Sequence, residues 1–485
     1  MRDPRPLVTG RNAIRYWQAY VVALLIAVAG CNPSPPPPPT FKPNELVALV
    51  RPGPAIWFPG PDGEPSGFDH ELLTRFARDQ GLALRVITVP SAGDLIARLA
   101  RGEGQVGLGG LFQAAGKAPA KNTDTDPADH VLWTSGTLPV EAVLIYNIDG
   151  YKPRTVADLE GATVVYPEGT GFETQLASTR LAHPEIHWKP LDVPSSDALI
   201  AQVSEGSIDY AIVPSNDAAV ARNIYLDFDA AFTIGPRRLL AWAVAPGQSK
   251  LRDALDNFFA RLRSDGVLAR EGERFFAPRS VERIDAGIFH DRIKGALPQF
   301  RKMFEVAQDV SGIEWRLLAA VAYQESQWDA FATSETGVRG FMQLTEETAR
   351  HLGVADRLDT RASITAAAKY LQTLKSKLPG RIPEPDRTWL ALAAFNIGIA
   401  HLEDARVLAQ KQKLNPDVWI DVKKTLPLLA QPEYYESAKY GYARGGMPVA
   451  FVDRVRAYYD ILLRSELPHK SRLRLSAEAA LIPPR

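Results

Sequence analysis

The chain has 485 residues, of which 46% are hydrophobic and 23% charged, and its formal net charge is zero. This length exceeds one ordinary hydrophobic core, so two or three globular domains are expected. A neutral chain without a dense run of Lys and Arg lacks the basic footprint of a nucleic-acid-binding protein. The single cysteine, Cys31, excludes an internal disulfide framework and a cysteine-rich zinc site.

Residues 1–30 have the pattern of a secretory signal peptide. Early arginines precede the apolar run 21–29, which is too short for a membrane-spanning helix, because that needs about 20 residues. Residues 28–31, Val-Ala-Gly-Cys, resemble the bacterial lipobox, whose cysteine is lipidated and becomes the new N-terminus. The resemblance implies a lipid on Cys31, and a signal anchor with an incidental cysteine is the alternative.

Asn32 occupies the position after the cysteine, where Asp signals inner-membrane retention in enteric bacteria. The resemblance therefore implies an anchor in the outer membrane, on its periplasmic face, and several acyl chains make such anchoring stable at ~0.8 kcal/mol per buried CH₂. Residues 31–43 contain the stretch PSPPPPPTFKP and predict an extended tether. Polyproline II rises about 3.1 Å per residue, so the stretch reaches roughly 30 Å, and a disordered linker is the alternative.

Residues 44–275 alternate short apolar runs with amphipathic helical stretches, which predicts an α/β sheet. The expected strands are 45–51, 82–89, 105–108, 162–166 and 210–214, and the expected helices are 69–80, 94–101 and 198–203. The pattern restarts near residue 156, so two lobes with a cleft between them are expected. His183 and His187 have a spacing that could hold a metal, but Pro184 lies between them. A surface loop is therefore favoured there, and no metal or cofactor is expected.

This region resembles the family 3 periplasmic solute-binding proteins through several short segments that follow in the right order. They are 67–69 (GFD), 94–99 (DLIARL), 156–164 (VADLEGATV), 206–209 (GSID) and 263–266 (RSDG). The resemblance implies a ligand cleft near Gly109, Gly169 and Thr170. Amino-acid binders of the family carry an arginine after the first-lobe glycine strand, and this chain has none between positions 102 and 154. A peptide or muropeptide is therefore the expected effector, and a domain that only spaces or docks the enzyme is the alternative.

Residues 276–464 show mainly helical periodicity. One apolar helical face is formed by Ile313, Leu317, Leu318, Val321 and Ala322. Glu325 lies one turn further along, where that face would meet a cleft. A carboxyl group against apolar neighbours resists ionisation, so its pKa rises and it stays protonated as a general acid. An ordinary surface glutamate is the alternative.

The run from Glu325 to Thr345, ESQWDAFATSETGVRGFMQLT, resembles the soluble lytic transglycosylase family. These enzymes have a lysozyme-like fold and cut the glycan strands of peptidoglycan. The matching positions are Ser326, Trp328, Asp329, Ser334, Gly337, Gly340, Met342 and Gln343. The resemblance implies that Glu325 is the catalytic residue. The substrate-binding residues that it implies in this run are Ser334, Met342 and Gln343.

Two later segments extend this resemblance. Residues 393–398 (AAFNIG) are similar to the family's Ala-Tyr-Asn-x-Gly segment, and residues 436–440 have the spacing of its Glu-Thr-x-x-Tyr motif. The resemblance implies that Asn396 and Tyr440 bind substrate, although a helix ending in glycine would also explain the first segment. Residues 440–445 are closer to membrane-bound lytic transglycosylases that carry a solute-binding-like domain ahead of the catalytic domain. The order of lipobox, binding module and lytic module matches them over nearly the whole chain.

The expected fold is therefore multidomain, with an α/β two-lobed periplasmic-binding-protein-like domain followed by a mainly α lysozyme-like domain and a loosely structured tail at 465–485. The implied function is cleavage of the MurNAc–GlcNAc bond of peptidoglycan with formation of 1,6-anhydromuramic acid. Asp329 lies one turn after Glu325 and could be a second carboxylate, but the family works with one acid. A hydrolytic muramidase and a non-enzymatic receptor for muropeptides or peptidoglycan remain as alternatives.

Overall fold

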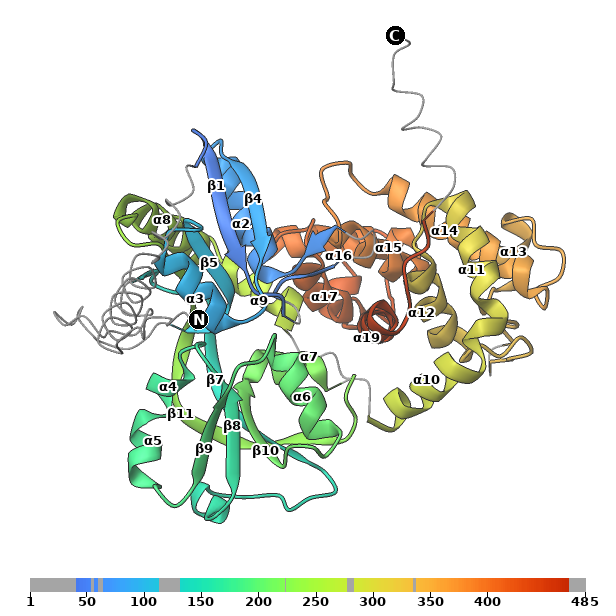
Figure 1. Cartoon of the computed structure of the whole chain (residues 1–485). Helices are drawn as coiled ribbons and strands as arrows, with labels where there is room; N and C mark the ends of the chain where they lie inside the picture. The colour runs from blue at the N-terminus through green and yellow to red at the C-terminus, as the bar shows by residue number, and fades with distance from the viewer. Residues whose placement is uncertain are drawn as a thin grey trace, which may run out of the picture.

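The computed structural model describes residues 41–53, 56–59, 64–112, 131–222, 224–276, 283–334 and 337–470 (Figure 1). The expected signal peptide, Cys31 and most of the proline-rich tether lie outside these residues. So does most of the 465–485 tail. The described chain forms an α/β part, blue to green in Figure 1, and a mainly helical part, yellow to red.

One continuous sheet path connects both lobes of the α/β part, in the order β4-β1-β5-β11-β7-β10-β8-β9. The first lobe contains β1 (Glu45–Val50), β4 (Ala83–Thr88) and β5 (Val106–Phe112), all parallel. The second contains β7 (Pro139–Asn147), β8 (Thr163–Pro167), β9 (His187–Leu191) and β10 (Tyr210–Pro214). The long strand β11 (Phe228–Val244) pairs antiparallel with β5 at one end and with β7 at the other, so it joins the lobes. The short strands are β2 (Phe58–Pro59), β3 (Pro65–Ser66) and β6 (Leu132–Trp133).

Helices cover the sheet of each lobe. They are α2 (Phe68–Asp79), α3 (Ala92–Ala100), α4 (Phe172–Gln175), α5 (Ala177–Ala182), α6 (Ser196–Ser204), α7 (Ser215–Ala221), α8 (Ser249–Ser264), α9 (Val267–Phe276) and the 3₁₀ turn η2 (Val156–Leu159). Local chemistry sets their starts: the Ser91 and Ser195 hydroxyls accept hydrogen bonds from the backbone N–H groups of Asp94 and Ala198, both at 3.2 Å. The expected strands and helices are confirmed, with ends that differ by a few residues.

Strands β7 and β11 were not among the expected elements. Strand β11 contains Gly235-Pro236-Arg237-Arg238 in its middle, which interrupts any apolar alternation. Its pairing with β7 shifts register around these residues, and the structure accommodates them at that irregularity. Tertiary pairing with two lobes therefore overrides a weak local strand pattern.

The helical part is built around α12 (Trp315–Ser326), which packs against α11 (Leu297–Ser311) and α19 (Gly446–Ser465). Residues 315–323 of α12 are all buried, so this helix is surrounded by the rest of the domain on every side, as a central helix must be. The other elements are α10 (Arg283–Gly295), α13 (Glu346–His351), α14 (Thr360–Lys377), α15 (Asp386–Ile397), α16 (Ile399–Lys411), α17 (Trp419–Thr425), η3 (Leu426–Ala430) and α18 (Pro432–Tyr435).

The start of the C-terminal tail differs from the expectation of a loose segment. The carbonyl oxygens of Glu466, Leu467 and His469 accept hydrogen bonds from side chains of α11 and α12, namely Arg316 at 2.7 Å, Trp315 at 3.3 Å and Gln308 at 2.9 Å. Residues 466–470 therefore pack along these two helices. The side chains of Glu466 and His469 add polar contacts with Arg301 and Asp309, so polar contacts, and not an apolar pattern that a sequence would show, hold this segment.

The two parts of the molecule touch along several elements. Helix α9 lies at the centre of Figure 1 and contacts both α2 and α17. Arg456 of α19 donates a hydrogen bond to the carbonyl oxygen of Arg274 at 3.1 Å, and Arg464 forms an ion pair with Asp197 of α6 at 3.1 Å. Hydrophobic cores remain separate, since one cluster ends at Phe275 and the next begins at Ala286.

Candidate active site

Glu325 lies on the last turn of α12, as the sequence predicted. The helix starts where the Glu314 carboxylate accepts a hydrogen bond from the backbone N–H of Leu317 at 3.1 Å, and it ends at Gln327, whose φ is 53°. Glu325 is half-buried, and its carboxyl group has no hydrogen-bond or ion-pair partner among the described residues. Burial alone raises the pKa of Glu325 from 4.5 to about 8. A carboxylic acid that stays protonated at neutral pH can donate a proton.

The turn after Glu325 is held by three side chains. The Ser326 hydroxyl donates to the carbonyl oxygen of Phe341 at 2.8 Å, and the indole N–H of Trp328 donates to Ala319 at 2.8 Å. Asp329 accepts a hydrogen bond from the backbone N–H of Phe331 at 2.9 Å. The Asp329 carboxylate thus orients the loop and is engaged there.

Residues 331–334 and 337–345 contact each other through polar side chains of predicted site residues. The Ser334 hydroxyl accepts from the backbone N–H of Val338 at 3.0 Å, and the Gln343 amide donates to Ala332 at 3.1 Å and to Gly340 at 2.9 Å. Gly340 has φ +86°, and a Cβ there would lie 2.1 Å from the carbonyl oxygen of Arg357, so only glycine fits.

The predicted substrate-binding residues therefore differ in what they offer. The Met342 side chain is 1% exposed and belongs to the core beneath the loop. Ser334 and Gln343 brace the loop through the bonds above. Asn396, near the end of α15, is exposed and has no bonded partner among the described residues. Tyr440 is 48% exposed. Of the predicted substrate-binding set, Asn396 and Tyr440 have exposed side chains.

Asp404, a residue of α16 that the sequence analysis did not single out, positions Tyr440. Its buried carboxylate accepts hydrogen bonds from the backbone N–H groups of Lys439 at 3.1 Å and of Tyr440 at 2.9 Å. The Tyr440 ring meets the ring of His401 edge-on, with centroids 6.4 Å apart. No local pattern marks Asp404, because its partners lie far along the chain.

Exposed aromatic side chains near these loops were also missed. Phe331, two residues after Asp329, is 75% exposed, and Tyr442 is 56% exposed. Single exposed apolar side chains are ordinary on protein surfaces, so these two rings become candidates for substrate contact through their positions close to Asp329 and Tyr440 in the chain. The sequence does not distinguish these two rings from core aromatic residues, because only the structure shows that they are exposed.

In the α/β part, the predicted cleft residues lie where the two lobes touch. A Cβ on Gly169 of the second lobe would lie 2.8 Å from the backbone nitrogen of Gly93 in the first lobe. The Thr170 carbonyl accepts from the backbone N–H of Phe112 at 2.8 Å, and its hydroxyl is fully buried and donates to Pro167. Gly109 has φ +134° and passes close to the backbone of residue 51. These residues bring backbones together rather than offering side chains to a ligand.

Arg51 is a charged residue of the cleft that the sequence did not predict. It follows β1 in the first lobe and is 2% exposed, and its Nε and Nη1 atoms have no hydrogen-bond acceptor. Asp217, in the first turn of α7 in the second lobe, is 3% exposed, and burial raises its pKa to about 7. The negative charge of Asp217 opposes the burial effect, which lowers the pKa of Arg51. The cleft between the lobes therefore contains the guanidinium group of Arg51, although no arginine follows the glycine-containing strand of the first lobe.

Comparison with known proteins decides the family. The Transglycosylase SLT domain family matches residues 302–418. A membrane-bound lytic murein transglycosylase F of Nitrosospira multiformis is 41% identical over 436 residues, covering 89% of this chain and 88% of that protein. The enzyme of the same name from Thiobacillus denitrificans is 40% identical over 468 residues, covering 95% and 96%. The chain belongs to the membrane-bound lytic murein transglycosylase F family.

As a lytic transglycosylase, the chain is an enzyme that acts on peptidoglycan, as the sequence analysis expected. Among solved structures, a mutant of the arginine-binding protein from T. maritima is similar to this chain at 20% identity and a TM-score of 0.40, covering 48% of this chain and 95% of that one. No helix of the described residues is both long and apolar enough to cross a bilayer.

Proposed function

We propose that Glu325 is the acid and base of this lytic transglycosylase, which cleaves the MurNAc–GlcNAc β-1,4 bond and leaves a 1,6-anhydromuramic end. The observation that carries the proposal is the unpartnered, half-buried carboxyl group of Glu325, whose pKa burial raises to about 8. Such a group is protonated at neutral pH and returns easily to that state after giving up its proton.

The reaction needs one proton transfer in each direction. Glu325 donates its proton to the glycosidic oxygen while the bond from that oxygen to the anomeric carbon of muramic acid breaks. The N-acetyl group of the substrate stabilises the positive charge at that carbon. The Glu325 carboxylate then takes the proton of the muramic 6-hydroxyl, whose oxygen bonds to the anomeric carbon. Glu325 ends protonated, and no water is consumed.

The environment of Asp329 favours this route over hydrolysis. A hydrolytic muramidase of the usual kind needs a second free carboxylate as base or nucleophile. Asp329 is not on the helix of Glu325, because α12 ends at Ser326 and two residues with positive φ follow, and its Oδ1 atom accepts a hydrogen bond from the backbone N–H of Phe331. Asn396 and Tyr440, both exposed, are the side chains proposed to hold the glycan beside Glu325, with Phe331 as an added apolar contact.

Mass spectrometry of the fragments released from purified cell walls tests the reaction type. We expect every new muramic end to be the 1,6-anhydro form, from the first minutes of digestion onward, because the internal hydroxyl replaces water. Digestion with a hydrolytic muramidase provides the matched control, with ends heavier by one water. Free reducing muramic ends as the initial product would contradict the proposal.

A lipid on Cys31 is proposed to hold the enzyme at the periplasmic face of the outer membrane. The support is the lipobox-like sequence at 28–31, Asn32 after it, and the membrane-bound relatives. We expect the parent to incorporate labelled palmitate and to sediment with outer membranes, because several acyl chains anchor stably. Cys31→Ala should lose the label and leave that fraction. A variant that stays in the outer membrane as fully as the parent would refute the lipid anchor.

The α/β domain is proposed to receive a peptide or muropeptide effector that regulates cleavage. Arg51 supports this, because a buried guanidinium with two unbonded N–H groups suits the carboxylate of such a ligand. Asp217, across the cleft, suits an amino group. A ligand that binds both lobes shifts the molecule toward the closed state by as much as it prefers that state.

A further inference from the structure

A cavity of about 410 Å³ lies between the two domains, away from both Glu325 and the lobe cleft. Helices α2 and α9 of the α/β domain form one wall of it. The other wall comes from α15, α17 and α19 of the catalytic domain and from the loops before α15 and α17. The cavity exists only while the domains are docked, because neither wall encloses it alone.

Several side chains that line this cavity have a buried N–H donor without an acceptor among the described residues. They include Arg456 through its Nε and Trp389 and Trp419 through their indole N–H groups, and these side chains are 4%, 8% and 1% exposed. The Arg456 guanidinium lies over the Trp389 ring, 5.1 Å from its centroid, so the two side chains form one surface. An unsatisfied buried donor costs free energy, and several of them around one cavity indicate a missing acceptor.

The acids that line the same cavity already have partners. Glu271 forms an ion pair with Arg274 at 2.9 Å, and Glu71 lies 3.7 Å from the same guanidinium. Glu384 is paired with Lys375 at 2.7 Å, and Asp386 accepts from the backbone N–H of Trp419 at 2.9 Å.

By contrast, Arg75 and Arg78 of α2 line the cavity without a bonded partner among the described residues. The unpaired groups among the cavity-lining residues are therefore hydrogen-bond donors and positively charged guanidinium groups.

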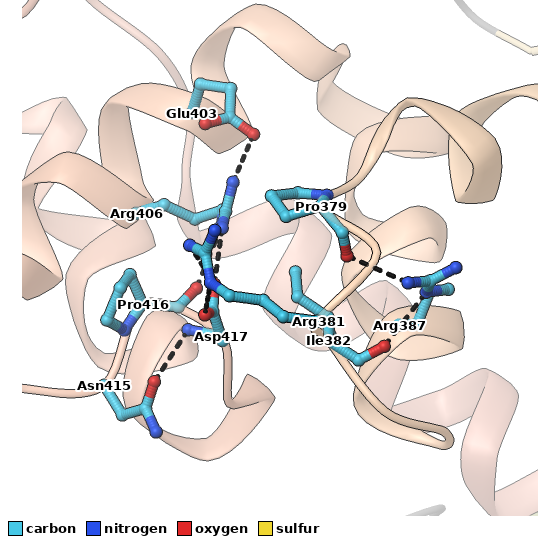
Figure 2. Close-up of polar contacts among 9 residues, drawn as sticks. All are labelled: Pro379, Arg381, Ile382, Arg387, Glu403, Arg406, Asn415, Pro416 and Asp417. Atoms are coloured by element: carbon cyan, nitrogen blue, oxygen red, sulfur yellow. Dashed lines mark hydrogen bonds and ion pairs between the residues drawn. The ribbon is translucent and has the colours of Figure 1, made fainter.

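Polar contacts stabilise the loops of the catalytic domain that contribute to the cavity wall. Figure 2 shows Arg381 and Arg406 converging on Asp417, at 2.5 Å and 2.6 Å, while Arg387 donates to the carbonyl oxygens of Pro379 and Ile382. These bonds hold the loops on both sides of Pro383 and Asn415, which line the cavity. A braced wall keeps the donors in place before a ligand arrives, which lowers the entropy cost of binding.

We propose that this interdomain cavity binds a small, multiply charged oxyanion, a phosphate or a polycarboxylate, between Arg456, the two indole N–H groups and the guanidinium groups of Arg75 and Arg78. The oxygens of such an anion are acceptors for guanidinium and indole N–H groups, and its negative charge complements the unpaired charges of Arg75 and Arg78. Because the anion contacts both domains, it binds only the docked arrangement and stabilises it.

Isothermal titration of the full-length protein tests the proposal, with sodium phosphate and sodium citrate as probes and ionic strength held constant with NaCl. We expect saturable binding of at least one probe, and the one that binds identifies phosphate or carboxylate chemistry. In the double variant Arg75→Ala/Arg78→Ala the affinity should fall at least tenfold. Both side chains are unpaired, so their removal leaves the fold intact.

Arg154→Ala is the matched control, because it removes an exposed arginine that is remote from the cavity. It should bind like the parent, and so should Arg51→Met, which removes the guanidinium of the lobe cleft. Absence of saturable binding for both probes would overturn the proposal. So would equal affinity in the double variant and the Arg154→Ala control, or loss of binding in Arg51→Met, which would place the anion in the lobe cleft.

Discussion

Glu325→Gln is expected to abolish wall cleavage while the protein stays folded. Glutamine keeps the shape of the protonated acid but can neither give nor take a proton. General acid–base catalysis contributes about 10² to 10⁴-fold, and one residue serves both steps here, so a loss of at least ~10³-fold is expected. Release of soluble fragments from purified walls, measured for parent and variant side by side, checks this.

The same variant should be more stable than the parent at neutral pH. Burial raises the pKa of Glu325 to about 8 in the folded state, against about 4.3 in the unfolded chain. The stability contribution of this group is therefore complete below pH 4.3 and is lost progressively as pH rises to 8. At pH 7 the variant should gain up to ~3 kcal/mol, and the gain should vanish near pH 4. Thermal unfolding across pH 4 to 8 measures it.

Asp329→Asn provides the control for the Glu325 variant. Its amide oxygen can still accept the hydrogen bond from Phe331, so activity within about threefold of the parent is expected. Two outcomes would contradict the role of Glu325: a Glu325→Gln variant as active as the parent, or a loss in Asp329→Asn as large as in Glu325→Gln. The parent should also lose activity as pH rises through 8, when Glu325 ionises.

Arg51→Met is expected to remove effector binding in the lobe cleft. Truncating one partner of a buried, hydrogen-bonded charge pair costs about 2–5 kcal/mol, which weakens binding by roughly 30-fold or more. Methionine fills the volume of the arginine stem without its buried, unbonded N–H groups. The free protein should therefore keep its stability or gain some. Titration of soluble muropeptides measures the affinity, in the Glu325→Gln background so that the probe is not cleaved.

Arg154→Met is the matched control for Arg51, because Arg154 is exposed on the same domain. Its affinity for muropeptides should equal that of the parent. If Arg51→Met binds the same muropeptides as tightly as this control, Arg51 does not hold the ligand. A variant that unfolds at a much lower temperature would instead assign Arg51 a role in the fold.

The Glu325 region was predictable because its signal is local. Helix, acid and loop are contiguous between residues 315 and 345, and the apolar run of α12 already implied burial and a raised pKa. Met342 shows the limit of such prediction. A matching position in a motif says that a residue is needed, but only its 1% exposure shows that it supports the loop from below.

The long strand β11 shows a second limit. Its central Gly-Pro-Arg-Arg stretch reads as a turn, yet the strand continues through it, since β7 and β5 supply partners at its two ends. Pairing partners distant in the chain are invisible to a local pattern. One sheet path through both lobes follows from this strand.

The sequence by itself determined the two-part architecture, the family and the position of Glu325, because contiguous residues carry each of these signals. Tertiary structure alone decided which distant charges meet. Asp404 positions Tyr440 across 36 residues, and Arg456 reaches Arg274 across 182. Arg51 faces Asp217 only because the lobes fold together, and the donor-rich cavity exists only because the domains dock. Such contacts depend on packing in space, which spacing along a chain does not encode.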